Sequence, residues 1–299
     1  MRTDPDHLPD RNRRDLARAV EILFAEFDDA TAIATQKWKK QGRILKIVLF
    51  GSFARGDWVA DPVGGYFSDY DILVVVSDRR LTDVLEFWAK ADDHLMRAVT
   101  IEKSISAPVN FVVHDLADVN DQLRHGRPFF VDIARDGIAL YEMERCDFEQ
   151  PHHLARAKQQ AEAQRYFDEW FKSAKNYQIL ASEAGGRGMP KEAAFLFHQS
   201  VERFYHCVLL VLTLYSPKSH KLNFLRSQAE SHEQRLIAVW PRDTRFGQRC
   251  FELLRRAYVE ARYSEHYKIT PEELEWIGQR IDVLQSLVRE ICEERLALG

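Results

Sequence analysis

Long apolar runs, paired cysteines and low-complexity segments are all missing from this sequence of 299 residues. No apolar stretch reaches the roughly 18 residues that a membrane-spanning helix needs, and the first thirty residues lack the apolar run of a secretory signal. The cysteines lie far apart, without the paired spacing of a zinc site or a disulfide framework. We therefore expect a cytoplasmic protein with no membrane contact and with reduced, mostly buried thiols. These are Cys146, Cys207, Cys250 and Cys292.

What the sequence does have is a sufficient share of apolar residues, 45%, to form a packed core. Its two halves also differ in charge. Residues 1–150 carry 20 Lys and Arg against 27 Asp and Glu, whereas residues 151–299 carry 22 against 19. This asymmetry indicates two domains and makes the second half the better candidate for an anionic partner. Ordinary solvated helix faces explain so small a basic excess at least as well.

The first half of the chain alternates helix and strand patterns. Its two continuous apolar runs are typical of buried strands, and the first of them ends directly at Gly51. These patterns predict a small mixed sheet flanked by helices, in a domain over residues 13–145. Strands are expected at 44–50, 70–76 and 109–113, helices at 13–27 and 81–99, and a short helix, a Gly137 turn and a closing strand within 128–141.

The second half contains almost no strand pattern. Apolar residues recur there every three or four positions, as in helices that bury one face. Thr270, Pro271 and Glu273 suit the N-cap, first and third positions of the last helix. We predict an antiparallel helical bundle over residues 152–297, and hence an α+β protein overall. Helices are expected at 152–182, 191–214, 220–230, 246–261 and 271–297, with a break at 185–190.

The most informative stretch is GSFARGDWVADPVGGYFSDYD, residues 51–71, which lies between two apolar strands. Gly51-Ser52 follows a strand and opens a helix, where close backbone approach and the helix N-terminus favour a triphosphate. Asp69 and Asp71 are two apart at the start of a strand, so both side chains point to one face. Paired carboxylates beside phosphate bind Mg²⁺, and two such ions can clamp both oxygens of a phosphoryl displacement. Each piece alone is common, but the combination is specific.

This joint pattern, with Ala-Arg-Gly after Gly-Ser and with five apolar residues after Ser-Asp-Tyr-Asp, resembles the minimal nucleotidyltransferases of the DNA polymerase beta superfamily. The resemblance covers about residues 40–142. It implies that the domain binds ATP, or another nucleoside triphosphate, together with catalytic Mg²⁺. The residues that it assigns to the nucleotide are Gly51, Ser52, Arg55 and Ser68, with Arg55 as a phosphate or structural contact, and those that it assigns to the metal are Asp69 and Asp71.

The sequence departs from that family in two places. The spacer from Phe53 to Ser68 is long, which implies an inserted loop rich in glycine and aromatic residues. Asn110 stands where the resemblance implies a third catalytic carboxylate. An amide can ligate a metal, but it cannot take a proton from an attacking hydroxyl. Three alternatives follow: His114 or Asp115 substitutes, the acceptor needs little deprotonation, or the domain binds nucleotide with weak or lost catalysis.

The second half resembles the HEPN domain over about residues 156–296, on the segments 191–215, 219–225 and 257–267. Many members of that family use an arginine and a histidine, separated by four to six intervening residues, as a metal-independent ribonuclease motif. The nearest match, Arg262 and His266, is separated by only three residues.

That short spacing allows two interpretations. On one helix face, Arg262 would stabilise a phosphate while His266 acts as acid or base. Alternatively, Arg262 pairs with Glu265 or with another nearby Asp or Glu, while His266 packs beside Tyr263 and Tyr267. The short spacing favours this second interpretation. His198, His206 and His220 lie on or beside apolar helix faces and are interpreted as core histidines.

The two resemblances together imply a transferase that moves a nucleoside monophosphate, most simply AMP from ATP, to a hydroxyl acceptor. That acceptor is a small molecule such as an aminoglycoside, an RNA, or a tyrosine of the HEPN half, for which Tyr263 and Tyr267 are the candidates. HEPN relatives also imply a homodimer through the helical domain. Two alternatives stay open: a HEPN ribonuclease toxin regulated by the nucleotidyltransferase half, and a nucleotide-binding protein without catalysis.

Overall fold

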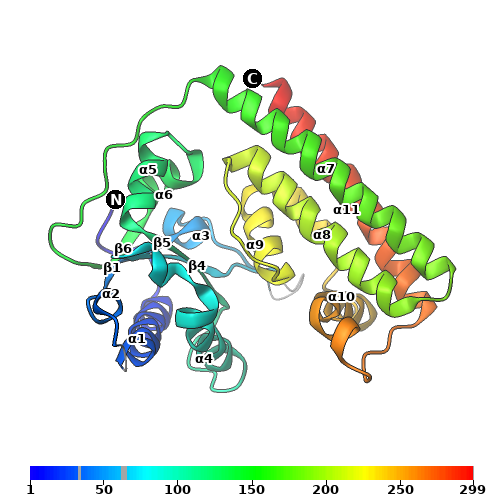
Figure 1. Ribbon diagram of the computed structural model, residues 1–299, viewed down its shortest axis with the longest axis horizontal. Coiled ribbons are helices and arrows are strands. Elements are labelled where there is room, and N and C mark those ends of the chain that lie inside the picture. The colour runs from blue at the N-terminus through cyan, green and yellow to red at the C-terminus, as the bar shows by residue number, and fades with distance from the viewer. Residues whose placement is uncertain (33–34, 62–65, 299) are drawn as a thin grey trace. The chain divides into compact units, whose positions relative to one another are not determined.

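The computed structural model describes residues 1–32, 35–61 and 66–298. The chain divides into two compact units, one made of Met1–Ala60 and Phe67–His153 and the other extending from Leu154 onward. The first holds a mixed sheet with flanking helices and the second is helical (Figure 1), which confirms the expected α+β class. The central glycines of the expected inserted loop, Gly64 and Gly65, lie outside the described residues.

The sheet of the first unit has the strand order β5-β4-β1-β6. Strand β1 pairs antiparallel with both β4 and β6, and β4 pairs parallel with β5. Every residue of β1 and of β4 is buried, which explains why both strands are apolar in sequence apart from Lys46 and Asp71. The strands are β1 (Ile44–Phe50), β4 (Tyr70–Val76), β5 (Val109–Asp115) and β6 (Ile138–Glu142), with a separate pair formed by β2 (Ala60–Asp61) and β3 (Tyr66–Phe67).

Helices cover both faces of this sheet: α1 and α4 lie on one side and α5 and α6 on the other (Figure 1). The helix expected at 81–99 is instead divided into shorter pieces. The carboxylates of Asp78 and Asp83 accept hydrogen bonds from the backbone N–H groups of Arg80 and Glu86. Each aspartate therefore caps the start of a separate helical turn. The helical elements are α1 (Asp10–Ala32), α2 (Lys37–Lys40), α3 (Gly51–Arg55), η1 (Arg79–Thr82), a π-helical turn η2 (Val84–Trp88), α4 (Ala89–Thr100), α5 (Leu116–Arg124) and α6 (Pro128–Asp136).

The second unit is built around three long helices, α7, α8 and α11, which run side by side (Figure 1). Helix α7 continues through Gly185 and Gly186, so the break predicted at 185–190 starts only at Arg187. Pro190 occupies the first turn of α8. The helical elements are α7 (Arg156–Gly186), α8 (Pro190–Thr213), α9 (Leu222–His232), η3 (Gln234–Val239), α10 (Arg245–Tyr263) and α11 (Pro271–Ala297).

Two compositional expectations also meet the structure. All four cysteines are free, and Cys207, Cys250 and Cys292 are buried, which confirms the expected unpaired thiols. Among the described helices, none combines the length and the apolar character that crossing a bilayer requires.

The N-cap of α11 is the capping box that its sequence predicts. The Thr270 hydroxyl accepts the Glu273 N–H at 3.2 Å, and the Glu273 carboxylate accepts the Thr270 N–H at 2.8 Å. Thr270→Ala removes the first of these bonds, so we expect the unfolding free energy of the helical unit to fall by about 1 kcal/mol. Denaturant unfolding followed by circular dichroism measures this loss. Thr3→Ala, at an exposed position of the other unit, is the control and should leave that transition unchanged.

Candidate active site

Three polar segments that are far apart in sequence meet at one edge of the sheet. Because β1 and β4 are antiparallel, the end of β1 lies beside the start of β4, and Phe50 is the register partner of Asp71. Because β4 and β5 are parallel, the start of β5 lies at the same edge, where Asn110 is the register partner of Asp71. The strand pairing therefore brings Gly51, Asp71 and Asn110 together.

The Asp71 carboxylate lies directly against the backbone of Gly51. Gly51 has a φ of +75°, a conformation that side chains rarely adopt, and a Cβ atom there would lie 2.6 Å from Asp71 Oδ2. Asp71 itself is buried. Glycine is thus required at position 51 twice, once for the backbone conformation and once for the space that the carboxylate fills.

Asp69 and Asn110 are directly hydrogen-bonded. The Asn110 Nδ2 donates to Asp69 Oδ2 at 2.9 Å, and both residues are half-buried. Within the described part of the chain, no three His, Cys, Asp or Glu side chains are grouped closely enough to hold a metal ion. Asp69, Asp71 and Asn110 thus offer the oxygens of two carboxylates and one amide. Mg²⁺ commonly binds through one or two carboxylates plus substrate phosphates, so this donor set fits Mg²⁺ together with a phosphate ligand.

Tyr70, the residue between the two aspartates, anchors this end of the strand from the opposite face. Its hydroxyl donates to Asp15 Oδ2 at 3.0 Å and accepts from Asn12 Nδ2 at 2.6 Å. The Ser106 N–H also donates to Asp15, at 2.9 Å. Burial raises the pKa of Tyr70, which keeps the phenol protonated as a donor. No sequence pattern near Tyr70 points to this anchor, because Asp15 lies far away in the chain, on α1.

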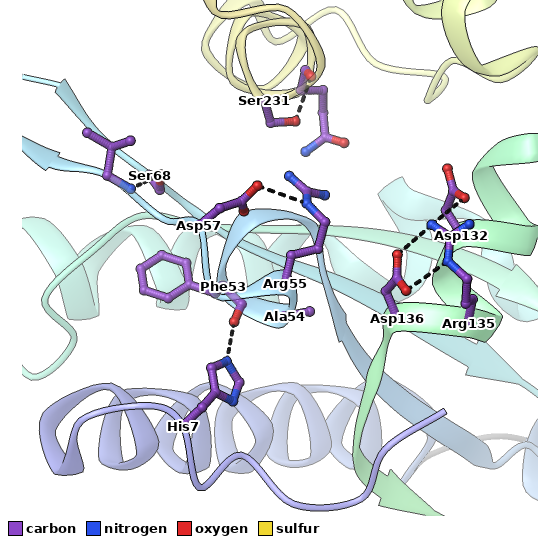
Figure 2. Close-up of polar contacts among 12 residues, drawn as sticks. His7, Phe53, Ala54, Arg55, Asp57, Ser68, Asp132, Arg135, Asp136 and Ser231 are labelled. Carbon is purple, nitrogen blue, oxygen red and sulfur yellow. Dashed lines mark hydrogen bonds and ion pairs between the residues drawn. The ribbon is translucent and has the colours of Figure 1, made fainter.

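Helix α3, which Gly51 and Ser52 open, is held from its carboxyl-terminal end. The imidazole of His7 contacts the Phe53 carbonyl oxygen at 2.8 Å (Figure 2), and the Arg2 guanidinium donates to the Ala54 carbonyl. Cationic and polar groups at the carbonyl end of a helix satisfy its last unpaired acceptors. The amino-terminal segment of the chain thereby fixes the position of the Gly51-Ser52 turn.

Arg55 and Ser68, both assigned to the nucleotide from sequence, are engaged by protein groups. The Arg55 Nε lies 3.2 Å from Asp57 Oδ2 (Figure 2). The Ser68 hydroxyl accepts the Val59 N–H at 2.9 Å, and the Ser68 N–H donates to the Val59 carbonyl at 2.9 Å. Both residues shape the segment that leads into the aspartates.

A carboxylate-rich patch on α6 adds to the electrostatics near Arg55. Arg135 pairs with Asp132 at 2.8 Å and with Asp136 at 2.6 Å (Figure 2). Burial raises the pKa of Asp132, while the Arg135 and Arg55 charges oppose that rise. Arg55 therefore lies near three carboxylates, those of Asp57, Asp132 and Asp136. This geometry is compatible with a role as a structural contact.

Neither His114 nor Asp115 can replace the third carboxylate. Their register partners on β4 are Val75 and Val76. Asp115 lies five residues from Asn110, about 16 Å along the strand, and His114 lies one residue closer. Asp115 caps α5 by accepting the Asp118 N–H at 3.1 Å. His114 Nδ1 lies 2.6 Å from the carboxylate of Asp118. The sequence-based alternative that one of them substitutes is wrong.

The candidate HEPN residues Arg262 and His266 do not share a helix face, because α10 ends at Tyr263. The Arg262 guanidinium lies over the rings of Phe195 at 5.0 Å and Tyr258 at 4.7 Å, and its Nε donates to the Tyr258 carbonyl at 2.7 Å. Glu265 approaches His266 at 3.6 Å rather than pairing with Arg262. Both sequence-based interpretations of this pair therefore need correction.

His266 is 88% exposed and lines a cavity of about 370 Å³. Arg262 is not among the lining residues, which are Arg249, Glu252, Leu253, Arg256, His266, Tyr267 and Lys268. Arg249 pairs with Glu273 at 2.6 Å and Arg256 pairs with Glu260. Both arginines of this lining are thus already paired with carboxylates.

The two candidate acceptor tyrosines differ sharply in access. Tyr263 is 77% exposed, whereas Tyr267 is 2% exposed. The Tyr267 hydroxyl donates to the Leu253 carbonyl at 3.0 Å, and burial raises its pKa. Of these two phenols, Tyr263 is the one that a reagent in solvent can reach.

A buried carboxylate on α8, Glu202, lies beside the three histidines interpreted as core residues. His198 and His206 are buried, whereas His220 is 59% exposed, so the core interpretation is wrong for His220. The Glu202 oxygens lie 3.1 Å from His220 Nδ1, 3.6 Å from His198 Nε2 and 4.0 Å from His206 Nε2. Burial lowers the pKa of His206 to about 4, so this imidazole is neutral at pH 7. The four-residue spacing of positions 198, 202 and 206 was the signal that could have found Glu202.

Gly51→Ala tests the contact between the glycine and Asp71. The added Cβ must displace the Asp71 carboxylate, so we expect divalent-cation affinity in the presence of a nucleotide to fall at least roughly tenfold, as when a ligand-orienting contact is lost. Calorimetric titration with Mg²⁺ and a non-hydrolysable nucleotide measures the change. Gly188→Ala is the matched control, because Gly188 has a φ of +73° with no atom within 4 Å of the new Cβ. Equal losses of affinity in both variants would contradict this account of Gly51.

Two family models match the chain. That of the polymerase beta nucleotidyltransferases matches residues 34–123, and that of the HEPN domain matches residues 167–291. No curated protein matches it significantly. The first match includes the whole sheet edge with Gly51, Asp71 and Asn110, and the second includes Glu202 and Tyr263. The chain therefore joins a nucleotidyltransferase domain of the polymerase beta type to a carboxyl-terminal HEPN domain.

Proposed function

We propose that this chain transfers AMP from ATP to a hydroxyl acceptor. The observation that carries the proposal is the meeting of the Gly51-Ser52 turn with Asp69, Asp71 and Asn110 at one sheet edge. The turn offers backbone N–H groups at close range to phosphate oxygens, since position 51 has no side chain. The paired carboxylates hold the cation side of the same site.

The oxygens of Asp69 and Asp71 would hold Mg²⁺, and the amide oxygen of Asn110 is a further neutral donor. When bound, Mg²⁺ supplies charge neutralisation on the triphosphate and on the leaving pyrophosphate. The chain's own groups orient the reaction: Tyr70 fixes the strand through Asp15, and the Asn110 amide fixes the Asp69 carboxylate. The transfer forms a bond from the acceptor oxygen to the α-phosphorus and breaks the bond to pyrophosphate.

The amide at position 110 bears on which acceptor the site can use. A carboxylate at that position would take the acceptor proton, whereas an amide cannot. A phenol has an ordinary pKa of about 10 and releases its proton far more readily than an aliphatic alcohol. The site is therefore best matched to a tyrosine, and the exposed hydroxyl of Tyr263 is the acceptor that we propose, in the same chain or in a second copy.

The mass of the purified protein after incubation with ATP and Mg²⁺ tests this proposal. We expect the mass of one AMP to be added to the natural chain and none to Asp69→Ala or Tyr263→Phe. Tyr267→Phe is the control, because its buried hydroxyl is not a substrate.

The outcomes separate the site from the acceptor. An adduct that persists in Asp69→Ala contradicts the assigned site. An adduct lost in Asp69→Ala but retained in Tyr263→Phe contradicts only the acceptor, and the modified residue is then located by peptide mass spectrometry. If neither the natural chain nor a protein that co-purifies with it gains the mass of AMP, transferase activity is contradicted.

Asn110→Asp restores a proton acceptor at the sheet edge. A positioned general base contributes roughly 10²- to 10⁴-fold, so we expect the initial rate at saturating Mg²⁺ to rise at least roughly tenfold toward an aliphatic hydroxyl. The rate toward a phenol should rise less, since that acceptor depends less on a base. Asn120→Asp, on α5, is the control for an added charge. An unchanged rate toward both acceptors would show that position 110 does not limit proton transfer.

A further inference from the structure

A groove of about 520 Å³ lies between the first half of α1 and the turn that follows α4. Its charged lining is mostly cationic, with four basic side chains and two carboxylates. The groove is separate from the sheet edge that carries Asp69 and Asp71, and none of those residues lines it. The lining residues are Arg11, Arg14, Asp15, Ala17, Arg18, Glu21, Lys103, Ser104 and Ser106.

Three of these cations, Arg11, Arg14 and Lys103, have no carboxylate within ion-pair distance among the residues that the structure describes, and all three are exposed. Neighbouring arginines behave differently. Arg13 pairs with Asp6 at 3.4 Å and also with Asp10, and Arg18 pairs with Glu21 at 3.1 Å. Acidic residues outnumber basic ones in this half of the chain, so carboxylates are available to pair with these cations. Three cations left unpaired in one groove therefore favour an anionic ligand.

The two carboxylates of the lining do not neutralise these cations. Glu21 is engaged by Arg18, and Asp15 is buried. The Asp15 carboxylate accepts bonds from the Tyr70 hydroxyl and from both the N–H and the hydroxyl of Ser106. The groove therefore keeps an excess of positive charge at its open surface.

The arginines form a row rather than a point. Positions 11, 14 and 18 are spaced by three and four residues, so they share one face of α1 and extend over about 10 Å of helix. Ala17 is the single apolar residue of the lining, so the groove offers no apolar wall for a base or an acyl chain. Such a surface recognises a chain of anionic groups by charge.

We propose that this groove binds the phosphate backbone of single-stranded RNA without reading its sequence. A row of arginines fits successive phosphates, each of which accepts guanidinium hydrogen bonds. A membrane surface is a poorer match, because interfacial helices insert apolar side chains beside their cations and this lining supplies only Ala17. Because Asp15 also holds Tyr70, the wall of the groove is hydrogen-bonded to the strand that carries Asp69 and Asp71.

Fluorescence anisotropy with a short labelled oligouridine RNA and the full chain tests the proposal. The affinity is measured between roughly 50 and 200 mM salt, because released counterions give a slope of log affinity against log salt of about −0.7 for each phosphate contact on a single strand. The triple variant Arg11→Gln, Arg14→Gln and Lys103→Gln should bind at least roughly tenfold more weakly, with a slope shallower by about 2.

Arg13→Gln is the matched control, since it removes one arginine of the same helix that is already ion-paired, and its affinity and slope should stay as in the natural chain. Unchanged circular dichroism and thermal unfolding of the triple variant establish that it is folded.

Four results would overturn the proposal. The first three are no RNA binding by the natural chain, unchanged binding by the triple variant, and an equal loss of affinity in Arg13→Gln. The fourth is a triple variant that keeps its affinity for RNA but loses affinity for inorganic triphosphate or for anionic vesicles.

Discussion

The contact between the Asp71 carboxylate and the Gly51 backbone is the constraint on which the site depends. It requires glycine at the end of β1, a left-handed φ there, and antiparallel pairing that sets Phe50 beside Asp71. A turn that exposes its backbone N–H groups then lies next to a buried carboxylate, which is the arrangement a phosphate with its cation needs. The anchors behind it, Tyr70 on Asp15 and His7 on the Phe53 carbonyl, hold the two sides of this contact in place.

The Asn110 amide changes what such a site can do. It donates to Asp69 and so orders a carboxylate that another acid at this position would repel. The same amide removes the proton acceptor that a third carboxylate supplies. In the transfer that we propose, the sheet edge therefore supplies binding and orientation, while deprotonation depends on the acidity of the acceptor. An exposed phenol such as Tyr263 meets that requirement from its own chemistry, and the buried Tyr267 does not.

The sequence predicted most reliably the features that local pattern determines. The continuous apolar runs gave β1 and β4 at their observed bounds, and the capping box of α11 follows from three neighbouring residues. Features that depend on distant partners or on helix ends escaped it. The spacing of Arg262 and His266 does not reveal that α10 ends at Tyr263. No residue near Tyr70 in the sequence indicates that Asp15 is its hydrogen-bond partner. Asp115 is the N-cap of α5, but this role can be recognised only when the start of that helix is known. From the sequence alone it therefore remained a candidate for the site.

The account's central claim is that one sheet edge holds both the phosphate and the cation. A crystal structure of the chain with Mg²⁺ and a non-hydrolysable ATP analogue tests this most directly. The account predicts the phosphates on the Gly51-Ser52 backbone and the metal in contact with the carboxylates of Asp69 and Asp71. Nucleotide bound elsewhere, or bound at this edge without metal contact to either aspartate, would contradict it.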